Sequence, residues 1–492
     1  MIKLKQDDII EVTVVDYGME GEGIAKLDEY TIFVPFVAVG EIAKVKVSFV
    51  KRNLIFADMV EIIKLSEART SYECNRFMKC GGCDLLHLNY DEQLNIKRLN
   101  LIKLLKKNAG YEGAVDDTIA SPKQFGYRNK IQLPFGTVNG KVAVGFFRKN
   151  THNIVSITKC YLHEDWAEKL INVFVSFAND FSLVSYDDVT NRGLLRHLVA
   201  RYIDGKICIV LVLNGAKLPH IDNLKSILKR EYGDNYSFYI SPHKEKNNVI
   251  LGNYVVPIVT NKFEIDILGI RLEVNPFSFL QLNSEVRDLI YNKVIDAICN
   301  NTEKEKIVID AYAGVGLMGA VLAKNGATIY NIEIVKEAIA DAKLLYKSNG
   351  IEDKATQICG DCAIELPKLI GSIKKAERVW HDAFSIKRAT TEIVTCDTQN
   401  DGNGSPNKQN LNNKSLSIIL DPPRKGCSDE VINALNTLST PHNLYYISCS
   451  PATLTRDLAK LKENYQIISI TPFDMFPQTK HLETLVCLNK KA

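Results

Sequence analysis

Runs of alternating apolar and polar residues fill the start of the chain and are separated by glycines. The runs cover residues 9–15, 31–36, 42–49 and 54–62. Short strands at this spacing are typical of a small closed barrel. The pattern therefore predicts an OB-like β-barrel over residues 1–63.

Longer apolar runs alternate with helical patterns from about residue 261 onward. A strand, a glycine turn and a helix are predicted over residues 306–326, and further strands over 327–332 and 443–447. Strands that alternate with helices favour a doubly wound, mostly parallel sheet. Residues 64–260 combine an amphipathic helix at 90–108 with strands near 206–213, which predicts a central mixed α/β domain. The fold class is α/β.

Residues 371–416 interrupt the last domain, 261–492. They lose the periodicity and are rich in Asn, Lys, Asp and Ser. A long stretch without regular structure inside a compact domain is usually a mobile loop. We expect such a loop here.

The composition narrows the class of protein. With 492 residues, 46% of them hydrophobic and 24% charged, the chain is an ordinary globular protein. No apolar run approaches the roughly 18 residues that a membrane span needs, and the first residues lack the apolar core of a signal peptide. We expect no membrane partner and a cytoplasmic location. The formal net charge of +3 leaves the partner open.

The 12 cysteines argue for metal or catalytic roles rather than for disulfides. Cys74, Cys80 and Cys83 form a tight cluster, and Cys160, in a polar setting, is the best candidate for a fourth ligand. Clustered thiolates bind zinc or an iron–sulfur cluster. A redox pair is the alternative, although it would not need Cys74.

The glycine turn at 314–319 points to a nucleotide-like cofactor. The pattern G-x-G-x-x-G occurs at Gly314, Gly316 and Gly319. A dinucleotide dehydrogenase has this pattern, but the same geometry admits S-adenosylmethionine. Glu333 would then accept hydrogen bonds from the two ribose hydroxyls of that cofactor. Asp361 could approach the adenine, and Asp421 ends the fourth strand before two prolines. Neither aspartate is expected at a hydride-transfer site.

Cys449 follows an apolar, strand-like run in the sequence YISCSPATL. Its sulfur would lie at the carboxyl end of a strand, where open α/β sheets keep their chemistry. The position alone would favour a buried cysteine that acts as a small hydrophobe. The motifs upstream favour a nucleophile instead.

Basic side chains occur in three places that RNA could contact. They lie in the barrel at Lys44, Lys46, Lys51 and Arg52, along the helix at 90–108, and in YRNK at 127–130. Aromatic and basic groups together suit base stacking and phosphate contact. Solvated lysines and strand-edge residues produce the same patterns, so both interpretations stay open.

Five motifs follow one another through the C-terminal domain. They are QLN at 281–283, DAYAGVG at 310–316, DPPRKG at 421–426, SCSPATLTRDL at 448–458 and HLETLV at 481–486. Together they resemble the RNA uracil-5-methyltransferase family. The N-terminal barrel resembles the TRAM RNA-binding module, and the four cysteines resemble the iron–sulfur cluster of the 23S ribosomal RNA branch. The resemblance covers nearly the whole chain.

The resemblance implies methylation of C5 of a uridine, with S-adenosylmethionine as methyl donor, on a Rossmann-like class I methyltransferase sheet. Cys449 would be the nucleophile and Glu483 the base. The cofactor site would be lined by Gln281, Tyr312, Gly314, Gly316, Glu333, Asp361 and Asp421. A [4Fe–4S] cluster would be held by Cys74, Cys80, Cys83 and Cys160. The RNA would be ribosomal, and we expect a monomer.

Other functions stay open. Methylation of a transfer RNA uridine would use the same residues. RNA cytosine-5-methyltransferases also add a cysteine to C6, but they carry a second cysteine within the fourth-strand motif, where this chain has Pro423. A noncatalytic RNA-binding iron–sulfur protein could keep the fold, although the intact Cys449 and Glu483 speak against it.

Overall fold

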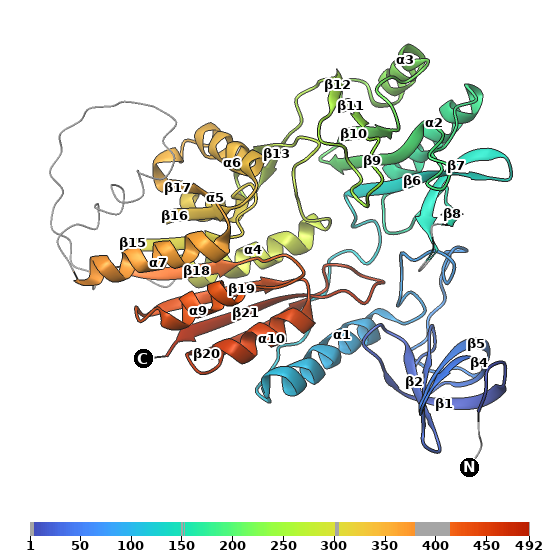
Figure 1. Cartoon of the computed structure of the whole chain (residues 1–492), viewed down its shortest axis with the longest axis horizontal. Coiled ribbons are helices and arrows are strands. Elements are labelled where there is room, and N and C mark those ends of the chain that lie inside the picture. Colours follow the sequence, from blue (N-terminus) through green and yellow to red (C-terminus); the bar gives the residue numbers. More distant parts are fainter. Residues whose placement is uncertain (1–3, 149–150, 152, 301–304, 379–413, 492) are drawn as a thin grey trace.

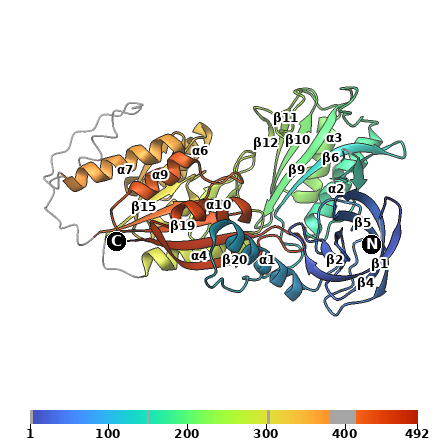
Figure 2. The same ribbon diagram turned by 60° about the horizontal axis from the view of Figure 1, so that its bottom comes forward.

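Three sheets organise the chain in the computed structural model, which describes residues 4–148, 151, 153–300, 305–378 and 414–491. The N-terminal barrel and the second sheet lie toward one end of the molecule, and the C-terminal sheet lies at the other (Figures 1 and 2). Within these ranges, no helix is long and apolar enough to cross a membrane.

Five strands close the barrel in the order β1-β2-β3-β5-β4. They are β1 (Ile9–Tyr17), β2 (Gly23–Leu27), β3 (Tyr30–Val34), β4 (Ile42–Lys51) and β5 (Leu54–Lys64). Alternate side chains such as Val12, Val45 and Ile55 fill the interior, as the two-residue period of strands requires. The predicted barrel is confirmed. The prediction missed β2, whose few residues follow a glycine-rich turn.

The second sheet has the order β12-β11-β10-β9-β6-β7-β8. Its strands are β6 (Lys130–Val138), β7 (Lys141–Phe147), β8 (Ile154–Ser156), β9 (Leu195–Ile203), β10 (Lys206–Leu213), β11 (Tyr236–Pro242) and β12 (Val256–Val259). Helices α2 (Asp165–Asp180) and α3 (Ile221–Tyr232) share an apolar core with it. The central part is therefore mixed α/β, as predicted.

The C-terminal sheet has the order β17-β16-β15-β18-β19-β21-β20. Its strands are β15 (Glu305–Ala311), β16 (Thr328–Glu333), β17 (Ala355–Cys359), β18 (Lys414–Leu420), β19 (His442–Ser448), β20 (Tyr465–Phe473) and β21 (Glu483–Lys490). β15 to β19 are parallel, whereas β21 runs antiparallel to β19 and β20. The hairpin β13 (Glu264–Ile267) and β14 (Ile270–Glu273) precedes it. This is the predicted Rossmann-like sheet.

Helices cover both faces of this sheet, which explains its continuous apolar strands. One core includes α4 (Ser284–Cys299), α5 (Leu317–Lys324) and α6 (Lys336–Ser348), followed by the short helix η2 (Glu352–Lys354). The other includes α7 (Cys362–Arg378), α9 (Asp429–Thr437) and α10 (Pro451–Leu461). The predicted loop at 371–416 thus begins within α7 and ends within β18. The rest of that prediction, 379–413, lies outside the described residues.

Helix α1 (Tyr90–Leu104) and the π-helical turn η1 (Leu105–Ala109) follow the barrel in sequence but pack on the C-terminal core. Leu101 and Leu105 are fully buried in the same apolar cluster as Leu454 and Leu458 of α10. The ribbon shows α1 beside α10 in both views (Figures 1 and 2). The domain boundaries at 63 and 260 stay predictions. Helix α1 belongs by sequence to the central domain but packs on the C-terminal domain, across the boundary at 260.

Candidate active site

Four strands of the C-terminal sheet end at the same edge, where the strand order reverses between β15 and β18. Open α/β sheets bind ligands at such a point. Tyr312, Glu333, Asp421 and Cys449 lie at or directly after the ends of β15, β16, β18 and β19. Asp361 follows β17 at the outer end of this row. The sheet therefore aligns residues that lie far apart in the sequence.

The glycine turn and Glu333 are joined by hydrogen bonds. The backbone N–H of Gly314 donates to Oε2 of Glu333 at 2.9 Å, and that of Val335 donates to Oε1 at 2.9 Å. A carboxylate can accept about four hydrogen bonds, which leaves capacity for two ribose hydroxyls. Gly316 has φ +71°, and a Cβ there would lie 2.9 Å from Nδ2 of Asn331. The turn therefore requires glycine, and these residues fit S-adenosylmethionine.

Two further predicted cofactor residues are anchored through neighbouring groups. The exposed Asp361 accepts the N–H of Ala363 at 2.9 Å at the start of α7. Gln281 precedes α4, and its carbonyl oxygen accepts a hydrogen bond from the side chain of Asn129, at 3.0 Å. Arg201 donates to the carbonyl of Leu280 at 3.2 Å and to the side-chain oxygen of Asn129 at 2.9 Å. The central sheet thus fixes the loop that carries Gln281.

Cys449 and Glu483 face each other at the end of two paired strands. Ser448 of β19 pairs with Thr484 of β21, so the next residues along the antiparallel register are Cys449 and Glu483. Glu483 is 2% exposed. Burial raises its pKa well above the usual range, and Asp421 raises it further. Burial, followed by Glu483, raises the pKa of the Cys449 thiol.

Asp421 lies between the cofactor turn and this pair. The many protein atoms around its carboxyl group raise its pKa to about 7, although the residue keeps a solvent-exposed surface. Burial, followed by Asp421, raises the pKa of the buried Asp310 below the glycine turn to about 7. Asp421 also raises the pKa of Glu483. Its carboxyl group therefore lies close enough to act electrostatically on both the glycine turn and the Cys449–Glu483 pair.

Helix α10 holds the loop after β18 against the loop that carries Cys449. Asp457 is fully buried and accepts hydrogen bonds from the Tyr446 hydroxyl at 2.7 Å and the Cys427 N–H at 2.9 Å. The Thr453 hydroxyl donates to the carbonyl of Arg424 at 3.1 Å. These contacts fix Arg424 next to the thiol of Cys449.

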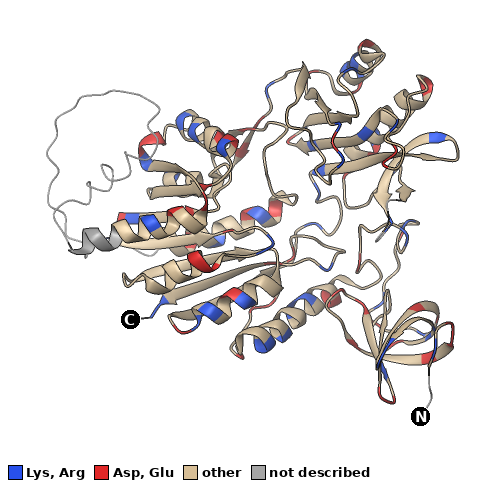
Figure 3. Ribbon diagram, viewed as in Figure 1, with Lys and Arg blue, Asp and Glu red and all other residues tan. Residues whose placement is uncertain are grey.

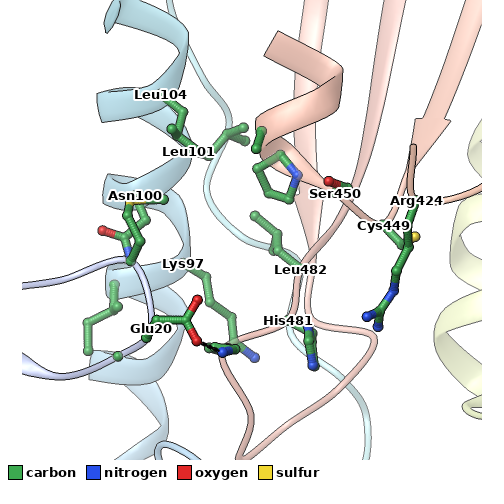
Figure 4. Close-up of a pocket in the computed structure, with 16 residues that line it drawn as sticks. Glu20, Lys97, Asn100, Leu101, Leu104, Arg424, Cys449, Ser450, His481 and Leu482 are labelled. Carbon is green, nitrogen blue, oxygen red and sulfur yellow. Dashed lines mark hydrogen bonds and ion pairs between the residues drawn. The ribbon is translucent and has the colours of Figure 1, made fainter. Parts of the chain in front are cut away.

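A cavity of about 450 Å³ opens beside Cys449, between α1, the tip of the barrel and the loop before β21 (Figure 4). Its polar lining includes Arg424, Lys480 and His481. Lys480 forms an ion pair with Glu20 of the barrel. Arg424 lowers the pKa of both Cys449 and Glu483. No role was predicted for Arg424 or His481, although Arg424 belongs to the DPPRKG motif and His481 to the HLETLV motif.

The four predicted cluster cysteines lie near one another. Burial raises the pKa of the Cys83 thiol, and Cys160, Cys80 and Cys74 raise it further, while the positive Arg128 lowers it. Among the residues that the structure describes, however, no group of three or more His, Cys, Asp or Glu is arranged to hold a metal ion. The thiols are neighbours without metal-site geometry.

Three of the proposed RNA-facing lysines form ion pairs at the protein surface. Lys44 pairs with Glu61 and Lys46 with Asp7 in the barrel, and Lys103 of α1 pairs with Asp16. In YRNK, Tyr127 is buried and donates its hydroxyl to Pro477, and Asn129 is buried as well. The RNA-facing interpretation of the buried Tyr127 and Asn129 is therefore not supported, whereas that of the exposed lysines stays a prediction. Figure 3 shows blue and red residues interspersed on the same helices.

Comparison with known proteins gives the family. Residues 407–491 match the sequence profile of tRNA (Uracil-5-)-methyltransferase, and residues 4–60 match that of the TRAM domain. An RNA methyltransferase of Clostridium tetani is 31% identical over 99% of this chain and 97% of its own length. One from Clostridium acetobutylicum is 31% identical over 100% of this chain and 99% of its own.

A solved structure shows the same fold. The Pyrococcus abyssi tRNA (uracil-54, C5)-methyltransferase in complex with S-adenosyl-L-homocysteine is 24% identical, with a TM-score of 0.70 over 97% of this chain and 99% of that one. The profile, the full-length relatives and the fold agree with one another. The chain belongs to the S-adenosylmethionine-dependent RNA uracil-5-methyltransferase family, as an enzyme with an N-terminal TRAM domain.

Proposed function

We propose that this enzyme methylates C5 of a uridine in ribosomal RNA, through a covalent bond between Cys449 and C6 of the base. The strand register that sets Cys449 opposite Glu483, beside Asp421, carries the proposal. A thiol and a carboxyl group on one base are the two groups that this reaction requires.

Cys449 solves the problem that C5 of uracil is too weak a nucleophile to attack a sulfonium methyl group. Its thiolate forms a bond to C6, and the C5–C6 π electrons move into an enolate with negative charge on C5 and O4. S-adenosylmethionine, when bound, supplies the electrophilic methyl group. C5 then carries both the new methyl group and its original proton.

Glu483 completes the reaction by removing that proton. The electrons of the C5–H bond re-form the C5–C6 double bond, the C6–S bond breaks, and Cys449 leaves as a thiolate. Glu483 must be ionised for this step although burial opposes ionisation. The guanidinium of Arg424 favours the ionised form of both groups.

The cofactor assignment follows the sheet edge. Glu333, which accepts the N–H of Gly314, would hold the ribose hydroxyls, and the backbone at Gly314 and Gly316 would border the methionine part. Asp361 lies toward the adenine. Gln281, Tyr312 and Asp421 line the remaining wall of the cofactor site.

The target uridine must leave the RNA stack to reach Cys449. Phe277 and Phe279 are 50% and 71% exposed, so they do not pack in the core. They are free to stack on the extruded base. Cys427 is buried and bonded to Asp457 through its N–H, so it does not supply the second thiol of a cytosine enzyme.

The cysteine set supports ribosomal over transfer RNA, because the resemblance ties it to the ribosomal branch. As the resemblance implies, Cys74, Cys80, Cys83 and Cys160 would hold a [4Fe–4S] cluster, which would require the thiols to move from the positions described above. Burial raises the pKa of the Cys83 and Cys160 thiols, and Arg128 offsets only part of this effect. The cytoplasmic location and the monomeric state stay predictions.

The reaction is tested by transfer of a labelled methyl group from S-adenosylmethionine to unmodified ribosomal and transfer RNA, with mass spectrometry of the nucleosides. We expect 5-methyluridine in ribosomal RNA. The same product in transfer RNA alone would change the substrate, and 5-methylcytidine would favour the cytosine enzyme.

Cys449→Ala is expected to abolish turnover and leave cofactor affinity nearly unchanged, because the thiol contacts the base rather than the cofactor. Calorimetry and the methyl-transfer assay measure the two properties. Cys427→Ala is the matched control and should keep the activity. Retained methylation by the first variant would eliminate the proposed nucleophile.

Activity is expected to rise with pH, because Cys449 and Glu483 act in deprotonated form and the pKa of each is raised. Arg424→Met should move the rise in kcat/KM to higher pH, since Arg424 lowers both pKa values. Lys425→Met, one residue away, is the control. An unchanged profile for Arg424→Met would contradict this role.

Protein purified without oxygen is expected to contain iron and inorganic sulfide in equal amounts, and Cys83→Ser should lose both. Metal analysis and visible absorption provide the measurement. Zinc without sulfide would overturn the cluster assignment.

A further inference from the structure

The loop that leads into Glu483 is long for a connection between neighbouring strands. β20 and β21 are paired from Phe473 and Glu483 onward, and residues 474–482 join them. Such strands are usually joined by about two to five residues. Strand pairing fixes the backbone of Glu483, but the turn itself does not fix the loop that precedes it, so other contacts must hold this loop.

Lys97 of α1 makes the first of these contacts. Its ammonium group lies 2.5 Å from Oδ1 of Asp474 and donates to the carbonyl of Phe476 at 3.2 Å. The side chains of Lys97 and Asp474 are 1% and 0% exposed. Two charges buried this deeply depend on each other, so the pair fixes the start of the loop. Lys97 projects from α1 toward the loop in Figure 4.

Gln93 makes the second contact, one helical turn earlier on the same face of α1. Its amide donates to Oε1 of Gln478 at 2.9 Å and accepts the backbone N–H of Gln478 at 2.9 Å. Gln478 has φ 69°, a left-handed conformation that a residue with a side chain adopts only under constraint. The reciprocal bonds from the buried Gln93 supply that constraint.

The segment after the cysteine cluster reinforces the same point. The backbone N–H groups of Asp84 and Leu85 both donate to the carbonyl of Gln478 at 3.0 Å. The hydroxyl of Tyr127 donates to the carbonyl of Pro477 at 3.0 Å. The middle of the loop is thus held from several sides.

The same helix also holds the other half of the catalytic pair. Leu101 and Leu105 pack against α10, which begins directly after the Cys449 turn, and Asn108 donates to the hydroxyl of Thr455 at 2.9 Å. One end of α1 therefore contacts the element that follows Cys449. The other end contacts the loop that precedes Glu483.

We propose that Gln93 and Lys97 are positioning residues that keep Glu483 over C5 of the bound base, and so set the rate at which the methylated RNA leaves Cys449. The inference rests on the proposed function, in which Glu483 acts only after methyl transfer. Loosening the loop should then slow release and spare the earlier steps.

The test is a single-turnover reaction of the full-length enzyme with unmodified RNA. Methyl transfer is followed by label, and the protein–RNA adduct by denaturing gel. For Gln93→Met we expect methyl transfer within about threefold of wild type and release slowed about tenfold or more, a part of the roughly 10²–10⁴ that a general base supplies. The adduct should accumulate. The double variant Lys97→Met with Asp474→Asn leaves no unpaired buried charge. It should show the same slow release and adduct accumulation as Gln93→Met.

Two controls separate the possible outcomes. Lys103→Met removes an ion pair of α1 with the barrel and should release RNA as wild type does. Glu483→Gln sets the largest adduct level, and if it traps no adduct the proposed base is wrong. If it does trap the adduct, the inference is overturned when neither loop variant accumulates it. It is equally overturned if, in the loop variants, adduct formation and RNA release both slow in proportion to a loss of folded protein measured by thermal unfolding.

Discussion

The pairing of β19 with β21 is the constraint on which the site depends, because it places a thiol and a carboxyl group at the same height of the sheet. Glu483 is buried and Cys449 is partly buried, which opposes the charges that the proposed reaction requires of them. Arg424, whose carbonyl accepts a hydrogen bond from Thr453 of α10, opposes this effect because its positive charge favours the thiolate of Cys449 and the carboxylate of Glu483. The charge of Arg424 thus offsets part of the rise in the pKa of Cys449 and of Glu483 that burial causes.

The rest of the C-terminal sheet brings the cofactor to this pair. The strand order reverses between β15 and β18. Asp421 directly follows β18 at this point, and Glu333 ends β16, the strand beside β15. Asp421 acts electrostatically on the acidic groups of both sides. The end of β18 therefore connects the glycine turn, where a methyl donor would fit, with the Cys449–Glu483 pair, where the base would be attacked in the proposed reaction.

Much of this was predictable from local sequence. Alternation gave the barrel, the glycine pattern gave the turn at Gly314, and carboxylates at strand ends gave Glu333 and Asp421, because these features depend on a few adjacent residues. The facing of Cys449 and Glu483 came only from the family resemblance. Strand register between distant segments is set by packing of the whole sheet, and no short window of sequence contains it.

The basic residues of α1 show the opposite limit. Lys97 and Lys103 have the spacing of a solvated or RNA-facing stripe, yet one is buried against Asp474 and the other pairs with the barrel. A lysine looks the same in sequence whether its partner is water, phosphate or a carboxylate hundreds of residues away. Only the tertiary structure identifies the partner.

The place of α1 has a consequence for how the chain folds during synthesis. The helix emerges from the ribosome soon after the barrel, but the apolar surface that Leu101 and Leu105 bury against belongs to α10, near the opposite end of the chain. Contacts between such distant segments form slowly. The nascent chain must therefore carry Leu101 and Leu105 without this apolar partner until translation is almost complete, and exposed apolar side chains of this kind are what chaperones recognise.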